Sequence, residues 1–372
     1  MIDKKIFLPV VLALGVAMLV SFFLTPLVKR LAHKIGAVDI PKDERRMHKE
    51  PIPRLGGLAI FIGCITALLA FAELDLQLCG ILIGSTIIVG VGIADDIRPL
   101  SAGLKLILQI ISALIAVGCG VQIQTIANPL PFGDAYLNFG IWAIPITVIW
   151  IVAVTNSVNL IDGLDGLADG VSTIGALTML VISLVMGDIP VAIICSALVG
   201  ACVGFIPYNM NPAKIFMGDT GSTFLGYMLA TISVMGLFKF WTAISFVVPF
   251  IILGFPIFDT TSAFTRRILK GQNPMTADRS HTHHKLIDMG MNQKQAVATL
   301  YLISCILGLC AMMIVSQGTV KVVLCVAALI VTAITVAHIA RYPHEHRKDS
   351  AAGKNHTHEH THDHTHEHKE DA

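Results

Sequence analysis

Charged side chains are scarce in this chain of 372 residues. Asp, Glu, Lys and Arg together make up only 14% of it, whereas 54% of the residues are hydrophobic. A soluble globular domain carries about a quarter charged residues, so this composition excludes an ordinary soluble domain. The net charge is only +1, and we expect no nucleic-acid partner.

Two other patterns are missing. No segment alternates apolar and polar residues over about ten positions, which is the pattern of lipid-facing β-strands, so a membrane β-barrel is excluded. The eight cysteines form no Cys-x-x-Cys pair, and all of them fall inside apolar segments. We therefore expect them to be small packing residues rather than disulfide partners or metal ligands.

What the chain does contain is long apolar runs. A helix needs roughly 18–24 apolar residues to cross about 30 Å of hydrocarbon. Eleven runs have about this length, at residues 6–28, 55–72, 78–94, 103–121, 139–156, 171–187, 190–208, 222–237, 240–258, 294–315 and 320–340. The first is too long for a signal peptide and is interpreted as a retained helix. The sequence predicts an all-α, polytopic integral membrane protein with about eleven transmembrane helices.

The basic residues orient these helices. If the N-terminus is outside, all 26 Lys and Arg fall on inner segments except Lys4, Lys5, Lys239 and Lys321. Short cytoplasmic loops are enriched in Lys and Arg. We therefore expect an external N-terminus, a cytoplasmic C-terminus and a location in the cell membrane.

The polar segments gather on the same inner face. We predict one membrane-embedded domain, residues 1–340, with a site formed by the loops 29–57, 94–105, 156–170, 209–222 and 259–293. The remaining residues, 341–372, have His at every second position from His356 to His368. This tail lacks apolar residues to bury and is predicted to be disordered, with weak Zn²⁺ or Ni²⁺ binding as an open alternative to a purely solvated segment.

Carboxylates are concentrated in three of these inner segments. Asp95 and Asp96 close the third run, where burial would require a cation or a proton; a pair facing water is the alternative. Lys105 could neutralise one of them or hold a phosphate. In NSVNLIDGLDGLADG, Asn156, Asn159 and Asp162 have the spacing of a polar helix stripe. Their oxygens are the hard ligands that suit Mg²⁺.

The segment NPAKIFMGDTGS carries Asp219 between two glycines. At the start of a helix an Asp is ordinarily a cap, but beside the other inner carboxylates we favour a Mg²⁺ ligand. Phe216 could stack on a flat base.

Cations lie on the remaining inner loops. Residues 259–286 contain Arg266, Arg267, Arg279 and the run His281, His283 and His284. No cysteine or well-spaced fourth ligand accompanies them, so phosphate-binding donors are favoured over a zinc site. The first inner loop adds Arg45, Arg46, His48 and Arg54, placed near lipid headgroups, with a plain topological anchor as the alternative. Metal-binding acids and phosphate-binding cations at a membrane surface indicate phosphoryl transfer between a soluble nucleotide and a lipid.

Four motifs in this order, VGIADD, NxxNxxDGxDGL, NPAxIFMGDTGS and HxHH, resemble those of the polyprenyl-phosphate N-acetylhexosamine-1-phosphate transferases, glycosyltransferase family 4. The motifs span roughly residues 40–290. The resemblance implies a Mg²⁺-dependent enzyme, with Mn²⁺ as a substitute, in which UDP-GlcNAc and undecaprenyl phosphate give undecaprenyl-diphospho-GlcNAc and UMP. Membrane lipids surround it, and a homodimer stays an open expectation.

The resemblance also implies roles by motif position. The Mg²⁺ ligands would be Asp219 and Asn156. Catalytic roles fall to Asp95, Asp96, Asp219, His281, His283 and His284, with Asp95 deprotonating or orienting the lipid phosphate. Substrate contacts fall to Lys105, Asn159, Asp162, Asp165, Asn209, Phe216, Arg266, Arg267, Arg279 and His48. Direct attack is favoured over a covalent aspartyl-phosphate, which the sequence leaves open.

The sequence DRSHTHHKL, preceded by TRRILKGQNP, looks like the UDP-GlcNAc branch, and teichoic-acid initiation is the preferred pathway. The same-class alternative is the phospho-MurNAc-pentapeptide translocase of peptidoglycan synthesis. Alternatives of another class are a nucleotide-sugar or cation transporter, which would place its carboxylates near mid-span, and a non-catalytic lipid-binding scaffold.

Overall fold

The computed structural model describes residues 4–39, 51–127, 136–236, 243–271 and 281–340, and these are almost entirely helical. The α-helices are α1 (Lys4–Ile35), α2 (Gly57–Phe71), α3 (Leu76–Ile97), α4 (Ala102–Gly118), α5 (Ala143–Leu160), α6 (Leu167–Met186), α7 (Ile189–Asn209), α8 (Gly218–Gly236), α9 (Ala243–Ile252), α10 (Gly254–Leu269), α11 (Thr282–Asp288), α12 (Gln293–Val315) and α13 (Gly318–Ala340). A short 3-10 turn, η1 (Gly140–Trp142), leads into α5. The predicted all-α class is confirmed.

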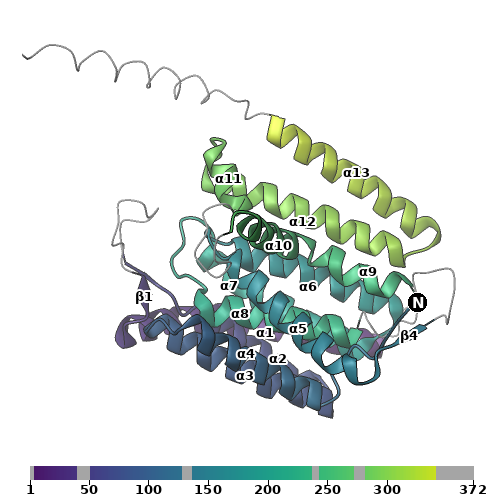
Figure 1. Ribbon diagram of the computed structural model, residues 1–372, viewed down its shortest axis with the longest axis horizontal. Coiled ribbons are helices and arrows are strands. Elements are labelled where there is room, and N and C mark those ends of the chain that lie inside the picture. Colours follow the sequence, from purple (N-terminus) through teal and green to yellow (C-terminus); the bar gives the residue numbers. More distant parts are fainter. Residues whose placement is uncertain (1–3, 40–50, 128–135, 237–242, 272–280, 341–372) are drawn as a thin grey trace, which may run out of the picture.

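The strands are confined to two short antiparallel hairpins. One pairs β1 (Val38–Asp39) with β2 (Ile52–Pro53), and the other pairs β3 (Thr125–Ala127) with β4 (Tyr136–Asn138). Figure 1 places β1 and β4 at opposite ends of the helical bundle. The β1–β2 hairpin lies at the end that carries the candidate site.

Each predicted apolar run falls on helix, with one difference. The ninth run is split at Leu253 into α9 and α10, and Pro249 lies inside α9. Seven helices of the described chain are long and apolar enough to cross a membrane, while α2 and α4 are shorter apolar helices. The chain is a multi-pass membrane protein; eleven crossings and the orientation of the termini stay predictions.

The helices run side by side, with α8 in the interior and α13 on the outside (Figure 1). Along α8 every residue except Asp219 is buried, and it packs against α2, α3, α5 and α6. Helix α13 packs mainly on α12 and exposes large apolar side chains such as Leu329 and Val322. Lipid tails can cover such a face without cost, whereas the small and polar residues of α8 need protein neighbours.

Glycines allow α8 to approach its neighbours closely. A Cβ on Gly57 of α2 would lie 2.1 Å from the Cα of Gly221, and one on Gly92 of α3 would lie 2.4 Å from the Cα of Thr220. Small residues at such crossings let helix backbones pack together in a membrane. The first turn of α8 is thereby held against the ends of α2 and α3.

We expect Gly92→Ala to destabilise the protein, because its new methyl group would meet backbone atoms of α8 that cannot move independently. Overpacking of this kind costs about 1–3 kcal/mol, and it should lower the unfolding temperature of the detergent-solubilised protein. Gly90→Ala on the same helix is the control, since nothing lies within 4 Å of its Cβ position. Equal melting temperatures for the two variants would contradict this packing.

Candidate active site

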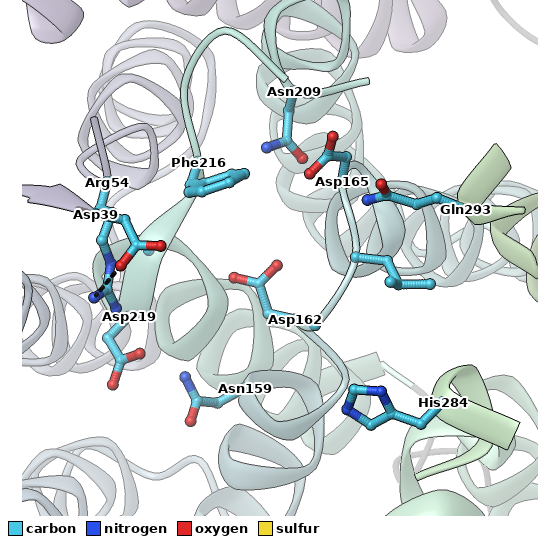
Figure 2. Close-up of a pocket in the computed structure, with 13 residues that line it drawn as sticks. Asp39, Arg54, Asn159, Asp162, Asp165, Asn209, Phe216, Asp219, His284 and Gln293 are labelled. Atoms are coloured by element: carbon cyan, nitrogen blue, oxygen red, sulfur yellow. Dashed lines mark ion pairs between the residues drawn. The ribbon is translucent and has the colours of Figure 1, made fainter. Parts of the chain in front are cut away.

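A polar pocket of about 470 Å³ lies at the end of the bundle that carries β1 and α11 (Figure 2). Its walls come from segments far apart in the sequence. The described lining residues are Asp39, Arg54, Asn159, Asp162, Gly163, Leu164, Asp165, Asn209, Phe216, Gly218, Asp219, His284 and Gln293. Figure 2 shows Arg54, Phe216 and Asp219 on one side of the pocket and Asp165, Gln293 and His284 on the other.

The first wall is built by main-chain pairing between residues 53–57 and 216–217. Phe216 N donates to Pro53 O at 2.8 Å, and the amides of Gly56 and Gly57 donate to the carbonyls of Phe216 and Met217 at 2.9 Å. Gly218 then turns the chain into α8 with φ +72°, and a Cβ there would lie 2.2 Å from the carbonyl oxygen of Arg54. Only glycine fits this turn.

Asp96 caps the start of α8. Its Oδ1 accepts from the amide of Asp219 at 3.0 Å, and its Oδ2 accepts from the amide and hydroxyl of Thr220 at 3.0 and 2.7 Å. These groups would otherwise be unsatisfied at a buried helix terminus. The Asp96 side chain is fully enclosed, so its carboxylate positions α8 and does not line the pocket.

Asp95, the adjacent carboxylate, faces a different partner. Lys105 Nζ lies 3.3 Å from Asp95 Oδ2 and 2.9 Å from Asp219 Oδ2, so one ammonium bridges the two acids. The other oxygen of Asp95 accepts from the Leu100 amide at 2.7 Å. Asn159 lies beside this group, and its Nδ2 donates to the hydroxyl of Ser222 in the first turn of α8 at 2.8 Å. Two carboxylates, one amide and one ammonium therefore meet at the start of α8.

The second wall begins with the loop between α5 and α6. Asp162 projects into the middle of the pocket (Figure 2). Burial, followed by the negative charges of Asp219 and Asp96, raises the pKa of the Asp162 carboxyl to about 7. A cation bound in the pocket would lower that pKa again, because it would stabilise the ionised form.

Side-chain ties hold this loop in place. Asp165 Oδ2 accepts from Asn211 Nδ2 at 2.9 Å and from the Ala213 amide at 3.1 Å. The hydroxyl of Tyr301 on α12 donates to the carbonyl of Gly166, whose φ is +77°. The loop is thus fixed from both the 209–217 segment and α12.

The histidines form a stacked group on the short helix α11. Asp259 on α10 accepts from His281 Nδ1 at 2.7 Å and from the amide and hydroxyl of Thr282 at 2.7 and 2.6 Å. The ring of His283 lies parallel to that of His281, with centroids 5.8 Å apart, and 4.3 Å from the His284 centroid. Burial, followed by the charge of His284, lowers the pKa of His283 to about 4. Only His284 of the three lines the pocket.

The predicted site residues divide into three groups. Those that line the pocket are Asn159, Asp162, Asp165, Asn209, Phe216, Asp219 and His284. Those that contact this group from behind are Asp95, Asp96, Lys105 and His283, and His281 stacks in turn on His283. Arg266 and Arg267, in the last turn of α10, do not line it, and Arg279 and His48 lie outside the described residues.

Asn156, predicted to be a metal ligand, is placed elsewhere. Its Nδ2 donates to Gln109 Oε1 at 2.7 Å, and Gln109 Nε2 returns a bond to its Oδ1 at 3.4 Å. Asn156 instead lines a second cavity of about 530 Å³ between α5, α9 and α10. That cavity is walled mainly by apolar side chains such as Ile149, Trp150, Phe250 and Ile257.

Several pocket residues were missed at the sequence level. Arg54 was placed near lipid headgroups but lines the pocket with Asp39, and Gln293 joins them from the start of α12. The Arg-Leu-Gly-Gly sequence before an apolar run signals a close backbone approach at Gly56–Gly57. Nothing local distinguishes Gln293 from an ordinary first residue of a helix.

The donor set agrees with magnesium. Within the described residues, no group of three or more His, Cys, Asp or Glu side chains is arranged to hold a metal. Mg²⁺ is usually bound through one or two carboxylates together with waters and substrate phosphates. The oxygen donors around Asp219 fit that pattern, whereas a zinc site needs a fuller set of protein ligands.

Comparison with known proteins identifies similar sequences. The model of "Glycosyl transferase family 4" matches residues 78–237. A probable undecaprenyl-phosphate N-acetylglucosaminyl 1-phosphate transferase of Bacillus subtilis is 43% identical over 85% of this chain and 87% of its own length. A decaprenyl-phosphate N-acetylglucosaminephosphotransferase of Mycolicibacterium smegmatis is 32% identical over 87% of both chains.

A third relative carries a different sugar in its name. A phospho-N-acetylmuramoyl-pentapeptide-transferase of Clostridium beijerinckii is 35% identical over 63% of this chain and 75% of its own. The extent of the first two matches decides the family, while the third shows that it contains more than one sugar specificity. The chain belongs to glycosyl transferase family 4, the family of the polyprenyl-phosphate N-acetylhexosamine-1-phosphate transferases.

Proposed function

We propose that this enzyme transfers GlcNAc-1-phosphate from UDP-GlcNAc to undecaprenyl phosphate, releasing UMP. The observation that carries the proposal is the meeting of Asp219, Asp95 and Lys105 at the end of a polar pocket. The cavity lined by Asn156 and apolar side chains of α5, α9 and α10 supplies a surface for a prenyl chain. A nucleotide sugar and a lipid phosphate could thus approach the same charged group from two sides.

The sugar assignment is supported by the relatives. The 43% identical relative is named for N-acetylglucosamine and an undecaprenyl acceptor, whereas the N-acetylmuramoyl relative is 35% identical over a shorter stretch. We extend the proposal to the first membrane step of a cell-wall polymer, with teichoic acid preferred. The site would face the cytoplasm, because that is where nucleotide sugars are made.

The chemistry requires an oxygen of the lipid phosphate to attack the phosphorus bonded to the sugar oxygen. The bond from that phosphorus to the bridging oxygen breaks, and UMP leaves with the bond's electrons. Lys105 would hold the attacking phosphate and offset its charge, and Asp95 would orient it or accept its proton. Catalysis here is mainly positioning and charge neutralisation.

Magnesium would be held by Asp219, and the amide of Asn159, rather than that of Asn156, lies beside it, with its Nδ2 donating to Ser222 Oγ. Bound there, the ion neutralises charge on the diphosphate and on the leaving UMP. Phe216 is placed to stack on uracil, and Asp162, Asn209 and His284 line the space for ribose, diphosphate and sugar.

The proposed activity is tested by UMP release from the purified protein in lipid nanodiscs. We expect release with UDP-GlcNAc, undecaprenyl phosphate and Mg²⁺ together, at least tenfold above the rate with UDP-MurNAc-pentapeptide. Omitting the lipid or chelating the metal with EDTA should abolish it, and Mn²⁺ should restore it. Release only with the MurNAc-pentapeptide donor would assign the enzyme to peptidoglycan synthesis. Transport of intact sugar without UMP release would indicate a transporter.

We expect Asp219→Ala and Asp95→Asn each to lower kcat by about 100-fold or more, the scale for loss of a group that stabilises transition-state charge. Both proteins should still insert and fold, because Asp95→Asn keeps an acceptor oxygen for the Leu100 amide and Asp219→Ala leaves the Asp96 cap of α8 in place. The control is Asp75→Asn, at the opposite end of α3, where the carboxylate accepts from the Leu78 amide and Asn caps equally well. Full activity in either site variant would contradict its role.

Asp96→Asn should behave differently from Asp95→Asn. An amide at this position offers one acceptor oxygen to three donors on Asp219 and Thr220, and its own NH₂ would face their N–H groups. Leaving buried groups unpaired costs about 1–3 kcal/mol, so this variant should lose both thermal stability and activity. Normal melting of Asp96→Asn with activity loss alone would show that Asp96 acts on substrate instead.

A further inference from the structure

Among the described residues that line the polar pocket, carboxyl groups outnumber fixed positive charges. Its described lining includes the carboxyl groups of Asp39, Asp162, Asp165 and Asp219, but Arg54 is the one Lys or Arg among those residues. Lys105 is already shared by Asp95 and Asp219 behind the pocket. A nucleotide diphosphate entering this space needs cationic donors besides any metal ion, and Arg54 is placed to provide them.

The backbone of Arg54 is rigidly placed. Its neighbours Pro53, Gly56 and Gly57 are hydrogen-bonded to residues 216–217. Its carbonyl oxygen packs directly against Gly218. Arg54 therefore lies next to Phe216, proposed to stack on the base, and next to Asp219, proposed to hold the metal (Figure 2). In a bound nucleotide sugar, the groups between base and metal are the ribose and the diphosphate.

The guanidinium is held loosely by its present partners. It lies 3.9 Å from Asp39 Oδ1 and 3.6 Å from Asp96 Oδ1, both longer than a hydrogen bond, and the side chain is 34% exposed. Asp96 already accepts three hydrogen bonds from the start of α8. These ion pairs keep the guanidinium at the wall of the pocket while leaving most of its five N–H donors for another acceptor.

We propose that Arg54 binds the diphosphate of the nucleotide-sugar donor, an assignment that rests on the proposed function. A planar guanidinium can donate two parallel hydrogen bonds to phosphate oxygens, which an ammonium cannot do. The competing role is a tether, in which Arg54 only joins the end of β1 to the end of α3 through Asp39 and Asp96. The two roles differ in which part of the nucleotide loses affinity when Arg54 is changed.

The test measures equilibrium binding of UDP and of uridine to the full-length protein in nanodiscs with Mg²⁺. Arg54→Gln should weaken UDP binding about 10–30-fold, the scale of lost charge-assisted hydrogen bonds, and change uridine binding less than about twofold. Arg98→Gln is the matched control, since Arg98 is an exposed cation just beyond α3. It should leave both affinities unchanged.

Unchanged UDP affinity in Arg54→Gln would overturn the proposal, and so would equal losses for UDP and uridine, which a tether predicts. If Arg54→Gln fails to fold, Arg54→Lys is the deciding variant, because it keeps the positive charge but not the paired N–H donors of the guanidinium. It should weaken UDP binding several-fold and leave uridine binding unchanged. Equal UDP affinity in Arg54→Lys and the native protein would then overturn it. Turnover of UDP-GlcNAc by the native protein is measured separately, so a failed proposed function is distinguishable from a failed role for Arg54.

Discussion

The start of α8 is the constraint on which the site depends. A helix that begins inside a membrane protein leaves amides without partners, and hydrocarbon offers none. Asp96 supplies them from the end of α3 through three hydrogen bonds. The same contact also sets the position of Asp219 relative to Asp95, which precedes Asp96 in the chain, and relative to Lys105 on α4. The two adjacent aspartates therefore have different contacts: Asp96 holds the start of α8, and Asp95 pairs with Lys105 beside Asp219.

The two walls of the pocket are held by different means. The first combines main-chain pairing of residues 53–57 with 216–217 and glycine-mediated packing of α8 on α2 and α3, so it has little freedom to move. The second is tied by side chains: Tyr301 to Gly166, Asp165 to Asn211, and Asp259 to His281. In the proposed function, the base and the metal bind at the first wall, through Phe216 and Asp219, and the sugar binds at the second. Changes of sugar specificity are therefore expected to concentrate in the second wall.

The sequence predicted the long helices well because hydrocarbon imposes them, and every long apolar run falls on helix within the described residues. It did not predict the split of the ninth run at Leu253, the short helix α11 or the two hairpins. Local motifs also selected Asp219, Asn159 and Phe216, which the structure places along the pocket, while their roles stay predictions. Local motifs could not show which residues tertiary contacts bring to the pocket. Asn156 and Asn159 are three residues apart, about 4.5 Å along the helix. The amide of Asn156 nevertheless pairs with Gln109, whereas the amide of Asn159 lines the pocket. Arg54 was interpreted as lying near lipid headgroups because its partner Asp96 and the pocket residue Phe216 are distant in sequence.

The charge distribution suggests why such an enzyme would depend on a divalent cation. Carboxylates outnumber fixed cations among the described lining residues, and the ammonium of Lys105 is already divided between Asp95 and Asp219. A diphosphate brought into that space would be repelled unless positive charge came with it. A divalent cation held by Asp219 would supply positive charge to offset both the carboxylates and the diphosphate. We therefore expect binding of the donor to depend on that cation, with the guanidinium of Arg54 beside Phe216 aligning the diphosphate.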